Sequence, residues 1–159
     1  SNMIYNFRMT FFHRRGEDYP WKQLEDLAPY RIGITIGNHY SDEFTALRTA
    51  GKLNVDPASA DAFNMKKLAS GRIDLFPMEQ ESGLMLADLT LTKAERATIT
   101  YQNHAIWEIP VYVVIHRGSP RAQELVDRFD QGYRRLSPGR IKALIEETRK
   151  AIRDQGKTP

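Results

Sequence analysis

The sequence predicts an α/β domain with a mostly parallel sheet and helices on both faces. Short runs rich in β-branched and aromatic residues alternate with amphipathic segments of helical length, which is the pattern of strands joined by crossover helices. Hydrophobic residues make up 41% of the 159 residues and charged residues 27%, so the chain has enough apolar material for a core. The length fits one domain, or one lobe with an appendage.

The first half of the chain alternates strands with helices. Phe7–Arg14 is aromatic-rich and predicts a strand, and the apolar spacing in Trp21–Leu27 predicts a short helical turn. A helix is expected to begin near Ser41, as its N-cap, and to stop at Gly51. The remaining elements expected here are strands at Arg31–Ile36, Leu53–Val55 and Ile73–Pro77, and helices at Ala60–Ser70 and from Glu81 to Leu86.

The second half predicts two more strands and two helices. Ala97–Tyr101 and Val111–His116 are the expected strands, and the β-branched second one would suit a buried position. A helix opens after Ser119-Pro120, and Arg140–Arg153 is a last amphipathic helix. The stripe of Leu125, Phe129 and Leu136 is expected to belong to the core, as are Phe11, Phe12 and Phe76.

Composition argues against several classes of function. The 23 basic and 20 acidic residues are too evenly balanced to indicate nucleic-acid binding, and the basic C-terminal region reads as a solvated helix face. The absence of cysteine excludes disulfides and thiolate sites, and the scattered histidines show no metal-ligand spacing. No run is long and apolar enough to cross a membrane, and no signal peptide is recognised. Hydrolase chemistry has no supporting motif.

The junction after the strand at Arg31–Ile36 is a candidate binding loop. Gly37 permits a tight turn, and the helix opening at Ser41 follows four residues later. Main-chain N–H groups and the helix dipole at such a junction suit a carboxylate, and ligands of open α/β sheets lie at the carboxyl ends of strands. A plain strand–turn–helix junction without a ligand is the alternative interpretation.

Glu79 is the second candidate. It lies just past the strand at Ile73–Pro77, where a carboxylate could pair with a ligand ammonium group. The alternative is a solvated loop residue.

The chain also resembles a known family in several strings of residues. These are W-K-Q-L-E-D-L at Trp21–Leu27, R-I-G-I-T-I-G-N-H-Y at Arg31–Tyr40, K-L-A-S-G-R-I-D-L-F-P at Lys67–Pro77, and the tail from Val111 to Leu136. Their order and spacing resemble the periplasmic solute-binding proteins of polar-amino-acid ABC transporters. The resemblance covers the chain from about Phe7 to Lys150 and implies one lobe of a clamp that closes on a small ligand.

The resemblance implies a domain organisation and a set of ligand-binding residues. Residues 3–155 would form a single periplasmic-binding-protein-like domain: 7–110 would be the second-lobe core, and 111–155 would return to a first lobe that is missing from this chain. The family's ligand-binding positions correspond here to Thr35, Gly37, Asn38, His39, Tyr40, Met78 and Glu79. Glu79 would hold the ligand α-amino group, whereas the arginine that clamps the ligand carboxylate belongs to the first lobe.

The function implied is non-catalytic binding of a small polar ligand, an amino acid or similar compound, for an ABC importer. The expected partners are that ligand and the transporter permease, with periplasmic localisation, no cofactor and no nucleic acid. An unpaired strand edge could also pair two copies of the chain. Two alternatives stay open: an extracytoplasmic sensory or interaction module, and a dehydratase-like relative in which His39 and Glu79 would be acid and base.

Overall fold

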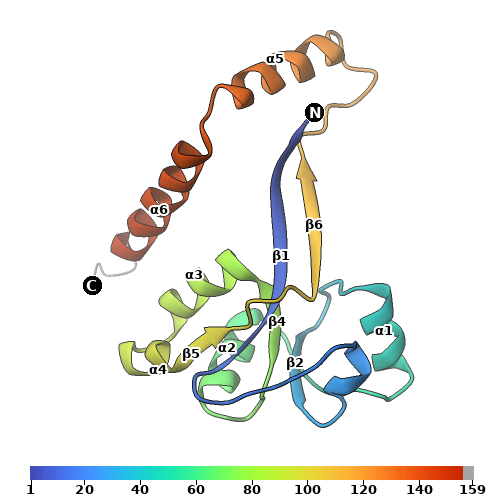
Figure 1. Ribbon diagram of the computed structural model, residues 1–159, viewed down its shortest axis with the longest axis vertical. Helices are drawn as coiled ribbons and strands as arrows, with labels where there is room; N and C mark the ends of the chain where they lie inside the picture. Colours follow the sequence, from blue (N-terminus) through green and yellow to red (C-terminus); the bar gives the residue numbers. More distant parts are fainter. Residues whose placement is uncertain (156–159) are drawn as a thin grey trace. The chain divides into compact units, whose positions relative to one another are not determined.

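The computed structural model describes residues 1–155 and divides the chain into two compact units (Figure 1). The core unit is Arg8–Trp107, and the terminal unit is Ser1–Phe7 together with the chain from Glu108 onward. The elements are β1 (Met3–Arg14), η1 (Leu24–Leu27), β2 (Arg31–Thr35), α1 (Asp42–Thr49), β3 (Asn54–Ala58), α2 (Asp61–Ala69), β4 (Phe76–Glu79), α3 (Gln80–Thr90), α4 (Lys93–Thr98), β5 (Ile99–Tyr101), β6 (Trp107–Tyr112), α5 (Ala122–Arg134) and α6 (Pro138–Gln155). The predicted α/β class is confirmed, and the strand pairing is mixed rather than mostly parallel.

Parallel pairing in the core unit is confined to β2, β3 and the segment that enters β4. β2 pairs with β3 in parallel register from Arg31↔Asn54 to Thr35↔Ala58. On its other side, β2 forms a parallel bridge at Ile32↔Leu75, directly before β4. β1 then pairs antiparallel with both β4 and β5. Because β2, β3 and β4 run in the same direction, their carboxyl ends lie at one edge of the sheet, called the carboxyl edge below.

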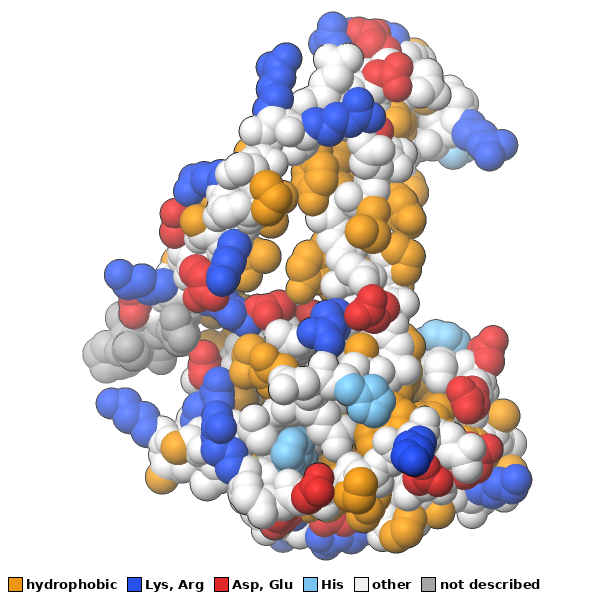
Figure 2. All heavy atoms as spheres, in the orientation of Figure 1, with side chains coloured by type: hydrophobic (Ala, Val, Ile, Leu, Met, Phe, Trp, Pro, Cys, Tyr) orange, Lys and Arg blue, Asp and Glu red, His pale blue; other side chains and the backbone are white. Residues whose placement is uncertain are grey.

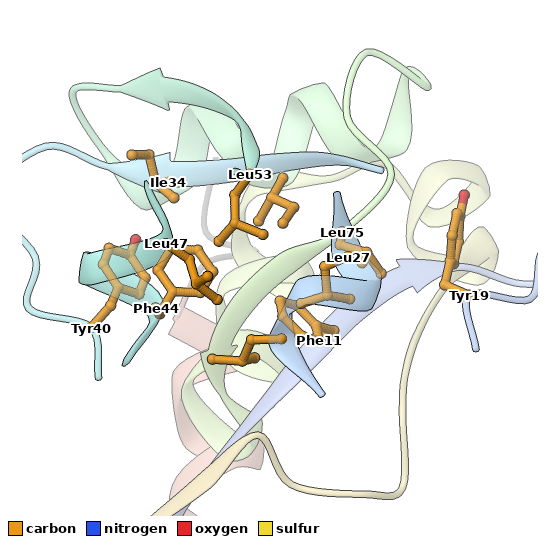
Figure 3. Close-up of a cluster of buried hydrophobic side chains, with 11 residues drawn as sticks. Phe11, Tyr19, Leu27, Ile34, Tyr40, Phe44, Leu47, Leu53 and Leu75 are labelled. Atoms are coloured by element: carbon orange, nitrogen blue, oxygen red, sulfur yellow. The ribbon is translucent and has the colours of Figure 1, made fainter. Parts of the chain in front are cut away.

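The core unit buries side chains on both faces of its sheet. Successive residues of β1 point to opposite faces, so Phe11 joins one hydrophobic cluster and Phe12 joins the other. The Phe11 cluster packs η1 and α1 against the sheet (Figure 3), and the Phe12 cluster packs α2 and α3. Helices therefore cover both faces, as predicted, and Phe11, Phe12 and Phe76 are core residues with exposed fractions of 0%, 0% and 1%.

α2 lies close to β2 because residue 33 has no side chain. A Cβ atom at Gly33 would lie 2.4 Å from Ile73 Cδ1 and 3.0 Å from Asn64 Oδ1. Both of these side chains are fully buried. The glycine thus allows the α2 face that carries Asn64 to approach the strand that leads to the carboxyl edge.

The terminal unit pairs β6 with β1 and continues into two helices. Within this unit, Asn2 N–H donates to Asp130 Oδ1 at 2.8 Å, and the Tyr133 hydroxyl donates to the Ile4 carbonyl. Figure 2 shows hydrophobic side chains along β1 and β6 at the surface. They include Met3, Phe7, Ile109 and Tyr112, which are 39–50% exposed. None of the helices that the structure describes has the length and apolar content needed to cross a membrane.

Several element predictions need correction. The strand predicted at Val111–His116 is β6 at Trp107–Tyr112, and Val114 is 88% exposed rather than buried. Pro110 lies inside β6, which pairs only with β1 among the described strands, and edge strands tolerate proline. The strand predicted at Ile73–Pro77 is β4 at Phe76–Glu79, which begins three residues later and ends two residues later.

Two further predictions differ from the structure. The core stripe of α5 is wrong in part, because Leu125 and Leu136 are 43% and 41% exposed. α4 was not predicted, although Thr92 and Glu95 form a capping box at its start. The two compact units meet between Trp107 and Glu108.

Candidate functional site

The loop between β2 and α1 leaves the sheet at the carboxyl edge through a tight turn. Asn38 N–H donates to the Thr35 carbonyl at 3.2 Å, and Gly37 has φ of +87°. That backbone conformation favours glycine, as the sequence predicted for this position. Gly37, Asn38 and His39 are exposed at the turn. Within the described part of the chain, the N–H groups of Gly37 and His39 have no protein acceptor, so both can serve a ligand.

Tyr40 holds this loop from inside the core. Its hydroxyl accepts a hydrogen bond from Thr35 N–H at 2.8 Å, and its ring packs beside Phe44 (Figure 3). Only 4% of the Tyr40 side chain is exposed, and burial raises the pKa of its hydroxyl. Tyr40 therefore positions the turn, and its ring is not open to a ligand in this structure.

The Thr35 side chain is hydrogen-bonded to two residues of α2. Its hydroxyl donates to Asp61 Oδ1 at 2.5 Å and accepts from Asn64 Nδ2 at 3.0 Å. Asp61 is the first residue of α2 and accepts a further hydrogen bond from Asn38 Nδ2 at 3.3 Å. This network ties the turn after β2 to the helix after β3.

Asp61 and Asn64 were missed by the sequence reading. The available signal was positional, because Asp61 follows the strand that precedes α2 and carboxyl ends of parallel strands share one edge. Asn64 is fully buried within a helix, where a polar residue needs a partner. Thr35 supplies that partner to its amide nitrogen.

Glu79 lies at the carboxyl end of β4 and caps α3. Its Oε1 accepts from Glu81 N–H at 3.1 Å, and its Oε2 accepts from the N–H and hydroxyl of Ser82, both at 2.7 Å. Those hydrogen bonds hold the carboxylate at the helix N-terminus, where the macrodipole favours negative charge.

Met78 precedes Glu79 and is half-buried against the Phe12 cluster. The topology thus brings both predicted regions, the Gly37 turn and the Met78-Glu79 pair, to the carboxyl edge. Charged groups at this edge come from separate strands: Asp61 follows β3, and Glu79 ends β4. Exposed N–H donors and carboxylate acceptors at one edge suit a ligand that carries both signs of charge.

Comparison with known proteins gives a fold and no closer assignment. No protein-family model matches the sequence, and no curated protein matches it either. Among solved structures, the chain is similar to an amino acid ABC transporter substrate-binding protein from Streptococcus pneumoniae bound to L-arginine, with a TM-score of 0.63 and 17% identity over 96% of this chain and 61% of the other. A mutant of ArgBP from T. maritima gives 0.62 and 14% identity over 92% and 59%.

A third similar structure is the GluR0 ligand-binding core from Nostoc punctiforme in complex with L-glutamate, with a TM-score of 0.54 and 15% identity over 100% of this chain and 65% of the other. The chain thus has a fold like that of amino-acid ABC transporter substrate-binding proteins. It spans only 59–61% of the length of the first two neighbours, so a partial periplasmic-binding-protein fold is what it shares with them.

Proposed function

We propose that this chain binds a free amino acid without turning it over, as part of the solute-binding component of an ABC importer. The observation that carries the proposal is the carboxyl edge of the core unit. There, the exposed N–H groups of the Gly37 turn and the carboxylate of Glu79 are placed by parallel strands of a substrate-binding-protein fold. The neighbours bound to L-arginine and L-glutamate support an amino acid as the ligand class.

In the proposed complex, Glu79 accepts the ligand ammonium while it continues to cap α3. A charge-assisted hydrogen bond of this kind is about twice as strong as a neutral one. The N–H groups of Gly37 and His39 receive the carboxylate, or another polar group, of the ligand. Asn38 and Met78 line the same edge.

Thr35 and Tyr40 contribute by position rather than by contact. The Thr35 hydroxyl sits between Asp61 and Asn64, and the Tyr40 hydroxyl holds the Thr35 main chain. A turn fixed from both sides costs less to order when a ligand binds. The proposal therefore adds Asp61 to the sequence-predicted set, as the residue that orients Thr35 and Asn38.

We also propose the domain organisation of residues 3–155 as a second lobe at about 7–110 with a return segment at about 111–155. The corresponding whole protein would add a first lobe that completes the clamp, act outside the cytoplasm in the periplasm, and deliver its ligand to a permease. These proposals follow from the neighbours, which are 59–61% covered by this chain.

The test is a calorimetric titration of the chain with each of the common amino acids, repeated with Glu79→Gln. Binding is expected for at least one amino acid, and Glu79→Gln should weaken it about tenfold, which matches the loss of one charge-assisted hydrogen bond. Glu25→Gln changes an exposed carboxylate on η1 and is the matched control. Equal affinity in the Glu79 variant and the parent would refute the assigned role.

A sensory module is the second candidate, and the GluR0 ligand-binding core is the observation that favours it. A sensory module and an importer component would bind ligand alike, so titration does not separate them. Stimulation of ATP hydrolysis by the reconstituted transporter would support the importer.

The dehydratase alternative assigns His39 and Glu79 as acid and base. It predicts that a bound compound is converted to product, and that no product forms with Glu79→Gln.

A further inference from the structure

A cavity of about 770 Å³ lies along α2 in the core unit, and nothing in the proposed amino-acid site accounts for it. Its volume falls within the range of roughly 300–1,000 Å³ that is typical of small-molecule sites. The lining comes from the β3–α2 loop, the exposed side of α2, the turn after α2, and the junction between α3 and α4. The lining residues are Ala58, Ser59, Phe63, Lys66, Lys67, Ser70, Arg72, Thr90, Thr92 and Glu95.

Three cationic side chains line this cavity, and two of them are available to a ligand. Lys67 is already committed, because its Nζ lies 2.8 Å from Asp56 Oδ1 and donates to the Pro57 carbonyl at 3.1 Å. Across the described residues, neither Lys66 nor Arg72 forms an ion pair with a carboxylate, and both are exposed. They are therefore the groups that an incoming anion would meet.

The carboxylate in the cavity does not neutralise these cations directly. Glu95 Oε2 accepts from the N–H of Thr92 at 2.9 Å and from its hydroxyl at 2.8 Å. These hydrogen bonds from Thr92 hold the pKa of Glu95 below its ordinary value, and the charge of Lys66 contributes less. Glu95 is thus engaged at the start of α4.

The hydroxyl groups of the lining are also largely engaged. Thr90 donates to the Leu86 carbonyl at 2.7 Å, and Ser70 donates to the Lys67 carbonyl at 3.1 Å. Recognition at this cavity consequently depends on the charges of Lys66 and Arg72 more than on hydroxyl donors.

Phe63 supplies an apolar surface beside these cations. It lies one helical turn before Lys66 on α2, and 55% of its side chain is exposed. An exposed aromatic ring in a cavity offers a stacking surface for a planar group. Cations and an aromatic ring together select for an anion that carries a ring.

We propose that this cavity binds a small organic anion with a planar ring, held by Lys66 and Arg72 at its charged end and by Phe63 at its ring. The shared chemistry could come from an aromatic carboxylate or from a nucleoside phosphate. The site does not require the carboxyl-edge site, and it stands or falls separately from amino-acid binding.

The test uses nuclear magnetic resonance titrations of the isotope-labelled chain with three probes: benzoate, adenosine monophosphate and inorganic phosphate. At least one ring-bearing anion should shift the amide signals of α2 and of the α3–α4 junction at millimolar concentration. Lys66→Gln and Arg72→Gln should each weaken that binding at least fivefold, and Phe63→Ser should weaken it without affecting inorganic phosphate. The probe that binds more tightly identifies the source of the charged group.

Lys52→Gln removes an exposed cation outside the cavity and is the charge control. The proposal is overturned if neither ring-bearing probe shifts these signals, or if Lys52→Gln weakens binding as much as Arg72→Gln does. Binding that is unchanged in Phe63→Ser would also overturn it, since the ring would then play no part. These positions are exposed, so the variants should fold, and an unchanged amide spectrum without ligand checks that they do.

Discussion

The two units of this chain differ in how far they bury their large apolar side chains. In the core unit, most large apolar residues are buried, and every described residue that the structure buries lies between Thr10 and Ile99. In the terminal unit, Leu125, Leu136 and Leu144 remain 38–43% exposed, although α5 and α6 are amphipathic. An amphipathic pattern thus indicates a helix, but a core requires a second surface for the apolar face to meet.

The two units also differ in what their arginine side chains bind. In the core unit, Arg14 donates to the carbonyls of Leu68 and Ile73 at 2.8 and 2.6 Å, which closes the turn between α2 and β4. In the terminal unit, Arg121, the N-cap residue of α5, pairs with Glu124 in the first turn of that helix at 2.5 Å, and both side chains are exposed to solvent. Partly buried hydrogen bonds across elements hold tertiary structure, whereas exposed pairs within one helix contribute little to it.

The largest expected effect comes from truncating one phenylalanine in each unit on the same strand. Phe12→Ala empties a site that is 0% exposed and should lower the free energy of unfolding of the core unit by about 3–5 kcal/mol. Phe7→Ala removes a ring that is 39% exposed and should cost less than about 1 kcal/mol. Urea denaturation followed by tryptophan fluorescence measures the effect on the core unit, which contains Trp21 and Trp107, and circular dichroism is needed to measure the effect on the terminal unit.

Equal losses at Phe7 and Phe12 would contradict the comparison, because the terminal segment of β1 would then be packed as firmly as the core. Following the same denaturation by circular dichroism sharpens the test, since α5 and α6 contribute to the helical signal but contain no tryptophan. Separate transitions by the two probes would mean that the units unfold independently.

A helical glycine in each unit should respond to alanine with opposite sign. A Cβ atom at Gly83 in α3 would lie 2.3 Å from Phe12 Cζ, so Gly83→Ala forces the core apart and should cost about 1–3 kcal/mol. Gly132 in α5 has nothing within 4 Å of such an atom, so Gly132→Ala should stabilise its helix by up to about 1 kcal/mol. Thermal denaturation followed by circular dichroism measures both. Destabilisation by Gly132→Ala would show that this position of α5 packs against another part of the protein.

The sequence predicted the core unit better than the terminal unit for a physical reason. Around β2, the local signals and the tertiary structure agree: a β-branched run, a glycine at positive φ, and Ser41 capping α1 through Phe44 N–H at 3.2 Å. In the tail, the β-branched residues Val111–Ile115 suggested a buried strand, but nothing in the sequence specified a surface to cover them. Val114 consequently remains exposed.

The candidate site could also be predicted only in part from the sequence. Gly37 and Glu79 could be identified because strand ends and charge are visible in the sequence. The sequence did not reveal that Tyr40 points into the core, because a tyrosine after a loop suits a ligand or a core equally well. It also did not reveal that Asp61 meets Thr35, since that contact depends on the register of β2 against β3. Long-range pairing places residues that local patterns cannot relate.

The last prediction tests the charge comparison through the pH dependence of stability. Asp74 accepts hydrogen bonds from Arg31 N–H at 2.8 Å and from the Arg31 guanidinium at 2.5 and 2.9 Å, and these bonds hold the pKa of Asp74 below its ordinary value. A carboxylate with a lowered folded-state pKa stabilises the fold above its unfolded pKa, near 3.9, and that contribution is lost as the pH falls through the folded-state pKa. Asp74→Asn should therefore lower the free energy of unfolding by about 1–2 kcal/mol at pH 7, and the difference from the parent should shrink steadily below about pH 4.

The control is Glu124→Gln, which changes the exposed ion pair at the start of α5. It should leave the urea midpoint of the core unit unchanged across the same pH range. If the free energies of unfolding of the parent and of Asp74→Asn differed by the same amount at pH 3 and at pH 7, the shape of the side chain at this turn, rather than its charge, would be what stabilises the core unit.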